Sequence, residues 1–452
     1  MKAKKSRKNF HEKFNHMVET LKNEICSDKY ADGDFLPSEN ALAERFELSR
    51  NSVRRGLEIL VEMGLIEKRP RVGNVVVKAP VQEQQVLRFG YYPSLLLEVD
   101  LQELLRKFEQ HYPTLRVYPV ALPSHLYHQT LLDYLRHGLV DVFCLNHTDF
   151  LSLKERGLLA SHAAELEPKP ELYPFLNDHL TDAGALYAYS LTFSPVILCY
   201  NLQHLQECGV EEPDSSWTWQ DLERAAQRLT KADRAGFYIH VRSNNRWPVF
   251  WLQTALDSPA ALDVVVERLL YANELICGPS PFAAYLSEND ADAEELFAQE
   301  KVSMIMTTYW GLNRLKEAPF PFDIAPLPHF GTPATLVLNI GVAVNAHGEN
   351  KAASQLLVDY LLSEEAQLHI REHTLSIPSR KGAAEWRGPA PAAALSRYNL
   401  YREIIPTYHT IDTLGCTQQQ LEEIRSDLRL FWSKMMERSA FEKRFTHILK
   451  NE

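Results

Sequence analysis

Two short amphipathic segments separated by a tight turn limit most strongly the folds that this chain can adopt. Ser38 can cap a helix that runs through Phe46, because a serine hydroxyl accepts a hydrogen bond from the open N–H groups of a first helical turn. Residues 47–48 then form a turn, and Ser49 can cap a second helix. The second helix has an apolar face of Val53, Gly56, Leu57 and Leu60, and an opposite polar arc of Arg50, Asn51, Arg54, Arg55 and Glu58.

Two helices joined by so short a turn, the second basic on its outer face, predict a helix-turn-helix with a recognition helix. The segment 65–77 is apolar on both sides of a stretch that carries Arg69 and Arg71, and it predicts a hairpin with a basic tip, a wing. Ahead of them, apolar residues at spacings of three and four predict a helix over 9–27. A basic helix face alone is usually only solvated surface. Here the turn, the cap, the charge arc and the wing agree, and they favour DNA binding.

The stretch GDFLPSENALAERFELSRNSVRRGLEILVEMGLIEKRPRVGNVVV resembles the GntR-type winged helix-turn-helix, and the resemblance covers residues 10–78. It implies base reading by Arg50 and Arg54, since the arginine fork can pair with guanine N7 and O6. It also implies phosphate contacts and a wing that reaches the minor groove. The candidate DNA-contacting residues are Ser38, Ser49, Arg50, Ser52, Arg54, Arg55, Arg69, Arg71 and Gly73.

This chain departs from the family pattern at two places. Asn40 stands where the family usually carries an arginine that contacts DNA. The wing reads RPRVGN instead of a glycine-rich tip followed by threonine. We therefore expect the fold to transfer more fully than the phosphate anchoring or the operator sequence.

Charge is distributed unevenly along the chain. Residues 1–80 hold 16 Lys and Arg against 12 Asp and Glu, whereas the rest of the chain holds 32 against 47. This asymmetry is typical of a chain in which one part meets nucleic acid and the other does not. A length of 452 residues also exceeds what one hydrophobic core usually supports, so we expect more than one domain.

The remaining global features favour a cytoplasmic location. The six cysteines are scattered without a CxxC pair, which fits reduced thiols better than disulfides or a zinc site. The basic start, MKAKKSRKNFHEKF, is not followed by the apolar run of a signal peptide, and no stretch is apolar enough for a transmembrane helix. We expect no membrane association.

After a polar linker at 79–85, the pattern alternates between strands and helices. We predict strands at 86–92, 115–122 and 139–146, with helices between them, and hence a parallel sheet covered on both faces. Ligands of such sheets lie beyond the carboxyl ends of the strands. That rule nominates Tyr92 and Ser94 after the first strand, and Asn146 and His147 after the third.

Five further landmarks resemble, in order, the solute-binding proteins of ABC importers, in the class typified by maltose-binding protein. They are YSLTFSPVILCYNLQHLQECGVEEPDSSWTWQDLERAAQRLT, LFAQEKVSMIMTTYWG, FDIAPLPHFG, IGVAVNAHGENKAASQLLVDYLLSEEAQ and IPSRKG. The resemblance implies a two-lobed α/β periplasmic-binding-protein-like fold, with chain crossings near 191–192 and 339–340 and a ligand cleft between the lobes. A C-terminal helix with Leu421, Ile424, Leu428, Trp432 and Met435 on one face should pack on lobe two.

The expected fold is therefore multidomain, with a mainly α N-terminal winged helix-turn-helix and a two-lobed α/β unit behind it. The boundaries are 1–78 for the DNA-binding domain, 79–85 for the linker and 86–452 for the sensing domain. Lobe one takes 86–190 and 340–375, and lobe two takes 191–339 and 376–452.

Trp310 is the first candidate for ligand binding, because the resemblance places it where the family often presents a tryptophan to a sugar. Flat aromatic faces bind the apolar faces of sugar rings, and charged or amide side chains bind the hydroxyls. Tyr309, Arg242, Asn244 and Trp247 are the next candidates. With seven Trp and nineteen Tyr, any single aromatic is more often a core residue. Trp217 and Trp219 are interpreted as packing residues.

The sequence therefore predicts a DNA-binding transcriptional regulator whose operator binding is controlled by a small molecule, a mono- or oligosaccharide. We expect a homodimer, by the usual two-fold operator geometry. No catalytic motif and no metal or cofactor motif is present, and His125 and His128 lack further ligands nearby. Two alternatives remain open: the large unit is a protein-docking platform without a ligand, or it is an enzyme of unrecognised type.

Overall fold

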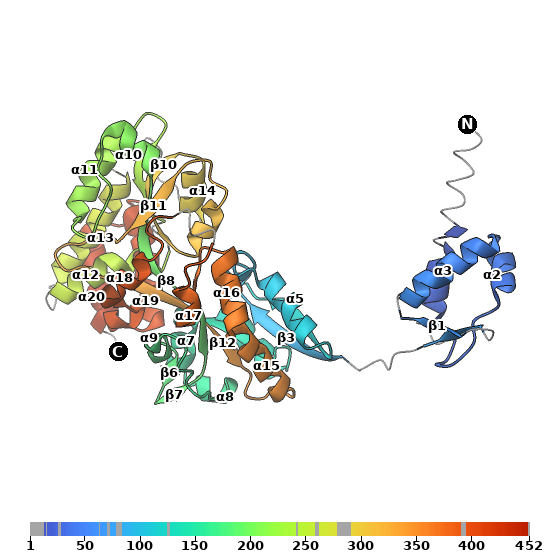
Figure 1. The fold of residues 1–452 in the computed structure, drawn as a ribbon. Coiled ribbons are helices and arrows are strands. Elements are labelled where there is room, and N and C mark those ends of the chain that lie inside the picture. Colours follow the sequence, from blue (N-terminus) through green and yellow to red (C-terminus); the bar gives the residue numbers. More distant parts are fainter. Residues whose placement is uncertain are drawn as a thin grey trace. The chain divides into compact units, whose positions relative to one another are not determined.

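The computed structural model describes residues 13–14, 16–25, 29–62, 64–69, 73–77, 84–123, 127–240, 243–257, 262–277, 291–389 and 395–450. The chain divides into two compact units, Met1–Gln85 and Val86–Glu452 (Figure 1). Each unit has its own hydrophobic core.

The first unit is a winged helix-turn-helix. A helix over 16–25 precedes α2 (Glu39–Phe46) and α3 (Arg50–Glu62), and β1 (Ile66–Arg69) pairs antiparallel with β2 (Gly73–Val76). The predicted faces of α3 are confirmed, because Val53, Gly56, Leu57 and Leu60 are buried and the arginines are exposed. The outer parts of the predicted helix 9–27 lie outside the described residues.

Local hydrogen bonds explain the tight turn between α2 and α3. The Ser38 hydroxyl accepts a hydrogen bond from the Ala41 N–H at 3.2 Å, and the Ser49 hydroxyl accepts one from the Ser52 N–H, also at 3.2 Å. Both serines therefore cap their helices as the sequence predicted. Glu47 ends α2 in the left-handed conformation, with φ 53°. A Cβ on Gly56 would lie 2.1 Å from the Met17 Cε, so the helix over 16–25 approaches α3 closely there.

The second unit begins with the predicted alternation of strands and helices. β3 (Gln85–Tyr91), β4 (Leu115–Ala121) and β5 (Val142–Asn146) form one edge of a ten-stranded sheet, and β3 runs parallel to β5. The amphipathic helix α5 (Leu101–His111) buries Leu101, Leu104, Leu105 and Phe108 against this sheet's core. Helices α6 (Tyr127–Arg136) and α7 (His147–Glu155) follow β4 and β5.

The expected parallel pairing is confirmed for β3 and β5, but the complete sheet is mixed. Two long strands, β8 (Tyr189–Asn201) and β12 (Thr335–Val344), run antiparallel to each other, and β12 is also antiparallel to β5. The strand order is β4-β3-β5-β12-β8-β10-β9. The strand and helix pattern of 86–146 gives no sign of these two crossing strands, because they come from distant parts of the chain.

Two hydrophobic clusters share β8 and β12. The first cluster forms the core of lobe one, and the second cluster forms the core of lobe two. Along β8, Leu191 belongs to the first cluster and Phe193 to the second. Along β12, Ile340 belongs to the first cluster and Val337 to the second. The strand register shifts between Ile340 and Gly341, next to this change. The chain passes from lobe one to lobe two once more, between Ile370 and Leu375, and this is the third crossing.

Lobe two contains the second cluster. Its strands β9 (Ala235–Tyr238) and β10 (Val302–Thr308) are parallel, while β11 (Phe322–Ala325) pairs antiparallel with β8. Its helices include α10 (Leu202–Cys208), α11 (Trp219–Leu229), α12 (Pro248–Asp257), α13 (Leu262–Cys277) and α14 (Asp292–Ala298). Trp219 is fully buried and Trp217 packs against the same cluster, as predicted.

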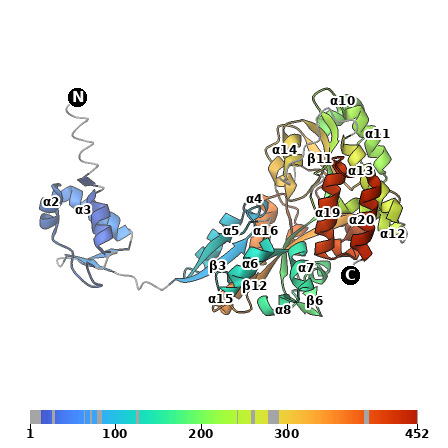
Figure 2. The same ribbon diagram turned by 180° about the vertical axis from the view of Figure 1, so that it is seen from behind.

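The C-terminal helices α19 (Gln418–Trp432) and α20 (Arg438–Lys450) pack together on lobe two (Figure 2). Four of the five residues predicted on the inner face of α19 are buried. Met435 was wrongly placed there: it is 78 % exposed, because α19 ends at Trp432.

The other elements are α4 (Leu95–Glu98), α8 (Leu159–His162), α9 (Pro174–Asp178), β6 (Thr181–Asp182), β7 (Ala185–Leu186), the 3-10 helix η2 (Gly311–Leu315), α15 (Lys351–Leu361), α16 (Glu364–His373), β13 (Ile377–Pro378), α17 (Lys381–Ala384), α18 (Leu400–Glu403), η4 (Ile405–Thr407), β14 (Tyr408–His409) and η5 (Ile411–Leu414).

Candidate DNA-binding face and interlobe site

The exposed face of α3 gathers the residues nominated for DNA contact. Arg50, Arg54 and Arg55 are exposed on it, Ser49 is exposed at its start and Ser52 is half-buried in its first turn. The Ser49 and Ser52 hydroxyls lie 2.7 Å apart and share a hydrogen bond. These hydroxyls serve the helix cap in the free protein, so a phosphate contact would add to an existing role.

Arg54 is fixed by a partner on the neighbouring helix. Its Nε and Nη2 donate to the two carboxylate oxygens of Glu39 at 3.2 and 2.8 Å. The Arg54 guanidinium lowers the pKa of the Glu39 carboxyl, with smaller contributions from the charges of Lys68 and Arg50. Glu39 is the first residue of α2, so the ion pair ties the two helices of the motif together.

The wing places Arg69 and Gly73 opposite each other at the end of the β1–β2 ladder. Arg69 is exposed, with its Nε 3.5 Å from a Glu67 carboxylate oxygen. Gly73 has φ 140°, a conformation that L side chains rarely adopt. Arg71 lies outside the described residues. Asn40 is exposed on α2.

Trp310 lies where the two lobes meet. It follows β10 of lobe two, yet its ring packs against the cluster of lobe one. Its indole N–H donates to the Thr192 hydroxyl at 3.2 Å, and Thr192 lies on the crossing strand β8. The side chain is half-buried. Part of the side chain therefore remains accessible at the junction.

A buried polar network holds the turn after Trp310 to the third crossing. The Asn313 amide donates to the Ser376 hydroxyl at 2.9 Å and to the Trp310 carbonyl at 3.1 Å. The Ser376 hydroxyl in turn donates to the Glu98 carbonyl at 2.6 Å. This chain of bonds connects η2 of lobe two with α4 of lobe one.

Glu98 is a perturbed carboxyl at the same junction, and the sequence reasoning missed it. Burial raises its pKa to about 7, although the Ser94 hydroxyl and the Arg314 charge act in the opposite direction. Its Oε2 has no hydrogen-bond partner within the described part of the chain. Ser94, one of the nominated ligand residues, is exposed beside it. A carboxyl of this kind can accept from a hydroxyl or donate to a carbonyl.

Tyr92 and Asn146, nominated from the strand ends, come together inside lobe one. The Tyr92 hydroxyl donates to the Asp149 carboxylate and accepts from the Asn146 N–H at 2.9 Å. The Asn146 side chain caps α7 by accepting from the Asp149 N–H at 2.8 Å. Burial raises the pKa of Asp149 to about 6 and that of Tyr92 well above its usual range. These groups satisfy one another within the lobe.

His147 links the lobes on another side of the junction. Its Nδ1 lies 2.9 Å from the His179 carbonyl oxygen and its Nε2 lies 3.1 Å from the Asp412 Oδ1. Both ring nitrogens therefore face an oxygen that can accept a hydrogen bond. The bond to His147 holds the pKa of the Asp412 carboxyl well below its usual range. Asp412 lies in η5 of lobe two.

A second bond reinforces this link: the Gln418 N–H at the start of α19 donates to the Glu155 carboxylate of α7 at 3.0 Å. Helices α19 and α7 are in contact.

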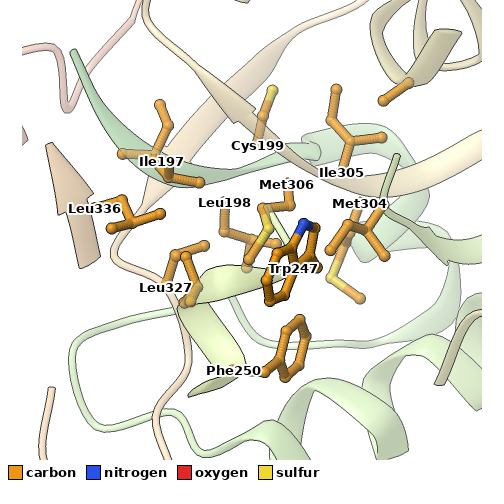
Figure 3. Packing of buried hydrophobic residues seen from close by; sticks show 14 of the residues in the cluster. Ile197, Leu198, Cys199, Trp247, Phe250, Met304, Ile305, Met306, Leu327 and Leu336 are labelled. Carbon is orange, nitrogen blue, oxygen red and sulfur yellow. The ribbon is translucent and has the colours of Figure 1, made fainter. Parts of the chain in front are cut away.

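Two aromatic candidates lie in the core of lobe two. Tyr309 is fully buried, and its hydroxyl donates to the Tyr398 carbonyl at 2.9 Å. Trp247 is 1 % exposed, and it lies among Met304, Met306 and Phe250 (Figure 3). Their burial explains why aromatic residue type alone is a weak guide to a binding surface.

The two remaining ligand-binding candidates are the polar residues Asn244 and Arg242. The Asn244 amide donates to the Glu422 carboxylate of α19 at 3.1 Å. Arg242 lies outside the described residues.

Glu39, Glu98 and Asp412 are the site residues that sequence reasoning did not find. Glu39 stands in the quoted GntR-type stretch, one position before Asn40, so its place in the motif was the available signal. Glu98 and Asp412 gain their partners from segments far away in the sequence, and no local pattern marks them.

No helix of the described residues combines the length and apolar content needed to cross a membrane. Over the same residues, no group of three or more His, Cys, Asp or Glu side chains is arranged to hold a metal ion.

Comparison with known proteins assigns a family to each unit. Residues 14–76 match the family of bacterial regulatory proteins called gntR. Over 51 residues the chain is 45 % identical to the "Probable transcriptional regulator PhnF" of Escherichia coli, covering 11 % of this chain and 21 % of that protein. It is 36 % identical over 61 residues to the E. coli HTH-type regulator YieP, covering 14 % of this chain and 26 % of YieP. The chain thus spans only about a fifth to a quarter of these relatives.

Solved structures match the second unit. The maltose-bound MalE3 of T. maritima superposes with a TM-score of 0.70 at 17 % identity, covering 81 % of this chain and 99 % of that one. The ABC substrate-binding protein Lmo0181 of Listeria monocytogenes, solved with cycloalternan, gives a TM-score of 0.66 at 18 % identity, covering 81 % and 98 %. Identities this low show the fold alone, and the two-lobed α/β architecture predicted from the sequence is confirmed.

The family model for bacterial extracellular solute-binding proteins matches residues 97–368. Since that match spans more than half of the chain, the chain belongs to the bacterial extracellular solute-binding protein family, and it carries a GntR-family helix-turn-helix domain ahead of the solute-binding unit.

Proposed function

We propose that the chain is a DNA-binding transcriptional regulator whose operator binding is controlled by a small molecule bound between the two lobes. The observation that carries this proposal is the presence in one chain of a GntR-family helix with an exposed arginine face and a two-lobed solute-binding fold. We propose 1–78 as the DNA-binding domain, 79–85 as the linker and 86–452 as the sensor. Lobe one would comprise 86–190 and 340–375, and lobe two 191–339 and 376–452. A regulator of this kind acts in the cytoplasm.

The proposed effector is a mono- or oligosaccharide. The solved relatives were crystallised with maltose, cycloalternan and, in a protein of Agrobacterium vitis, D-mannitol. In this chain, half-buried Trp310 offers an aromatic face at the junction, and exposed Ser94 and the Glu98 carboxyl offer hydrogen-bonding groups from the opposite lobe. Together they are the combination that sugar rings need.

Control requires that the effector bind two arrangements of the protein with different free energy. Ligand contacts on both lobes would favour the arrangement in which the lobes approach each other. We propose that this change alters the spacing of the two recognition helices in a homodimer, and with it the affinity for a two-fold operator.

Two measurements on the full-length chain test the proposal. In vitro selection from a random double-stranded DNA library should yield a defined site. A thermal-shift panel of sugars, sugar alcohols and sugar acids should yield a stabilising compound. If no DNA sequence is enriched, the proposed DNA binding is refuted. If no compound of the panel stabilises the protein, the proposed sensing of a small molecule is refuted.

A docking platform without a ligand is the second candidate for the large unit. Its support is that Tyr92, Tyr309 and Trp247, all nominated for ligand binding, are buried within the lobes. If no compound of the thermal-shift panel stabilises the protein while DNA binding is retained, this candidate is favoured. Neither matched family is a family of enzymes, and we propose that the chain has no catalytic activity.

A further inference from the structure

The three arginines on the exposed face of α3 differ in how they are held. Arg54 donates through Nε and Nη2 to both carboxylate oxygens of Glu39. Within the described residues, Arg50 and Arg55 have no hydrogen bond or ion pair. One arginine of the recognition helix is therefore held by a partner, and the other two are not held in this way.

The fork between Arg54 and Glu39 determines which donors remain available. Nε and one N–H of Nη2 are engaged by the carboxylate, so Nη1 and the second Nη2 N–H remain for an external acceptor. The Arg54 side chain is 47 % exposed, so those donors can reach a ligand. An arginine already held in one geometry loses less side-chain freedom when it binds than a free one does.

Glu39 also imposes an electrostatic cost on DNA binding. Its carboxylate is close enough to the charges of Arg54, Lys68 and Arg50 to have its pKa lowered by all three. An acid within such a basic surface opposes the approach of phosphates. If the side chain at position 39 served only to strengthen DNA binding, a negative charge there would be unfavourable.

We propose that Glu39 is a positioning residue that makes Arg54 the selective base reader of α3, with guanine as the preferred base, while Arg50 and Arg55 supply affinity with less selectivity. Two parallel N–H donors match the O6 and N7 acceptors of guanine. The inference rests on the proposed DNA-binding function and adds to it the residue that sets its specificity.

The Glu39→Gln variant tests this inference, because glutamine keeps the size of the side chain but loses the charge and one acceptor. Arg54 can then turn toward a phosphate. We expect affinity for all DNA sequences to stay equal or to rise, since one negative charge is lost. At the base pair read by Arg54, we expect the preference for the selected base to fall on the order of fivefold.

The assay uses the full-length protein and the site obtained by in vitro selection from a random library. Binding to that site and to each of its single-base variants is measured by fluorescence anisotropy. The base pair read by Arg54 is the one at which Arg54→Ala loses preference. Glu39→Asp should recover part of the preference, and the double variant Glu39→Gln/Arg54→Ala should match Arg54→Ala in selectivity. Glu44→Gln removes an exposed charge from the same helix and is the matched control.

A merely structural role for Glu39 predicts a different pattern, in which affinity falls for every sequence alike and the melting temperature falls with it. That pattern, or an unchanged preference at the Arg54 base pair, overturns the inference while the proposed function stands. If the wild-type protein selects no sequence at all, both fail together.

Discussion

Glu98 gives the sharpest prediction for the sensor unit. Burial at the lobe junction raises its pKa from 4.5 to about 7, so the folded state favours the protonated carboxyl. The associated stability is fully present below the unfolded value of 4.5, and it is lost as the pH rises through about 7. The difference between the two pKa values corresponds to about 3 kcal/mol as an upper limit.

Glu98→Gln should remove this pH dependence, because the neutral amide resembles the protonated carboxyl. At pH 4, below the unfolded value of 4.5, the wild type and the variant should unfold at nearly the same temperature. At pH 8 the variant should be more stable by up to about 3 kcal/mol.

The assay is thermal unfolding of the full-length chain followed by tryptophan fluorescence. All seven tryptophans lie in the second unit, so the signal reports that unit without interference from the first. Glu403→Gln, at an exposed position of α18, is the control for the loss of one charge. Equal pH slopes for the wild type and Glu98→Gln would refute the placement of Glu98 in a desolvated junction.

Three further predictions use the same unfolding signal or a ligand titration. Trp310→Ala should weaken binding of any stabilising sugar at least tenfold, by loss of the aromatic face; isothermal titration with unchanged affinity would rule out Trp310 as the platform. Gly236→Ala should destabilise the unit by about 2 kcal/mol, because the new Cβ would lie 1.9 Å from the Ala226 carbonyl oxygen; a stability equal to wild type would contradict this close approach. Asp412→Asn should cost about 1 kcal/mol at pH 7, a modest value because its side chain is 54 % exposed. Since the folded pKa of Asp412 is lowered, the difference should begin to shrink near its usual value of 3.8 and should disappear as the pH falls through the lower folded value. An unchanged difference at pH 3, or full additivity with His147→Asn in a double-mutant cycle, would show that the bond between His147 and Asp412 does not stabilise the folded chain.

The winged helix-turn-helix was predictable from local sequence, because its determinants are local. Helix caps at Ser38 and Ser49, the apolar spacing of α3 and the short turn all act within a few residues of one another. The same holds for the amphipathic α5 and α19. Met435 was misplaced because helical spacing does not reveal that α19 ends at Trp432.

The mixed sheet and the lobe junction were harder to predict from the sequence, because they depend on contacts between distant segments. β8 and β12 pair across more than a hundred residues of chain, and the resemblance indicated them where the periodicity did not. Glu98 gains its environment from η2 and from the segment at Ser376. Tyr309 and Trp310 are neighbours in sequence, yet one is buried in lobe two and the other packs on lobe one.

The central claim is that a ligand of the second unit controls DNA binding by the first. The most direct test measures the dissociation constant of the full-length protein for its selected DNA site, with and without a saturating concentration of the sugar that stabilises it. We predict a change of at least about fivefold, the lower range of allosteric coupling, and its loss in Trp310→Ala. Identical dissociation constants with and without the bound sugar would contradict the account.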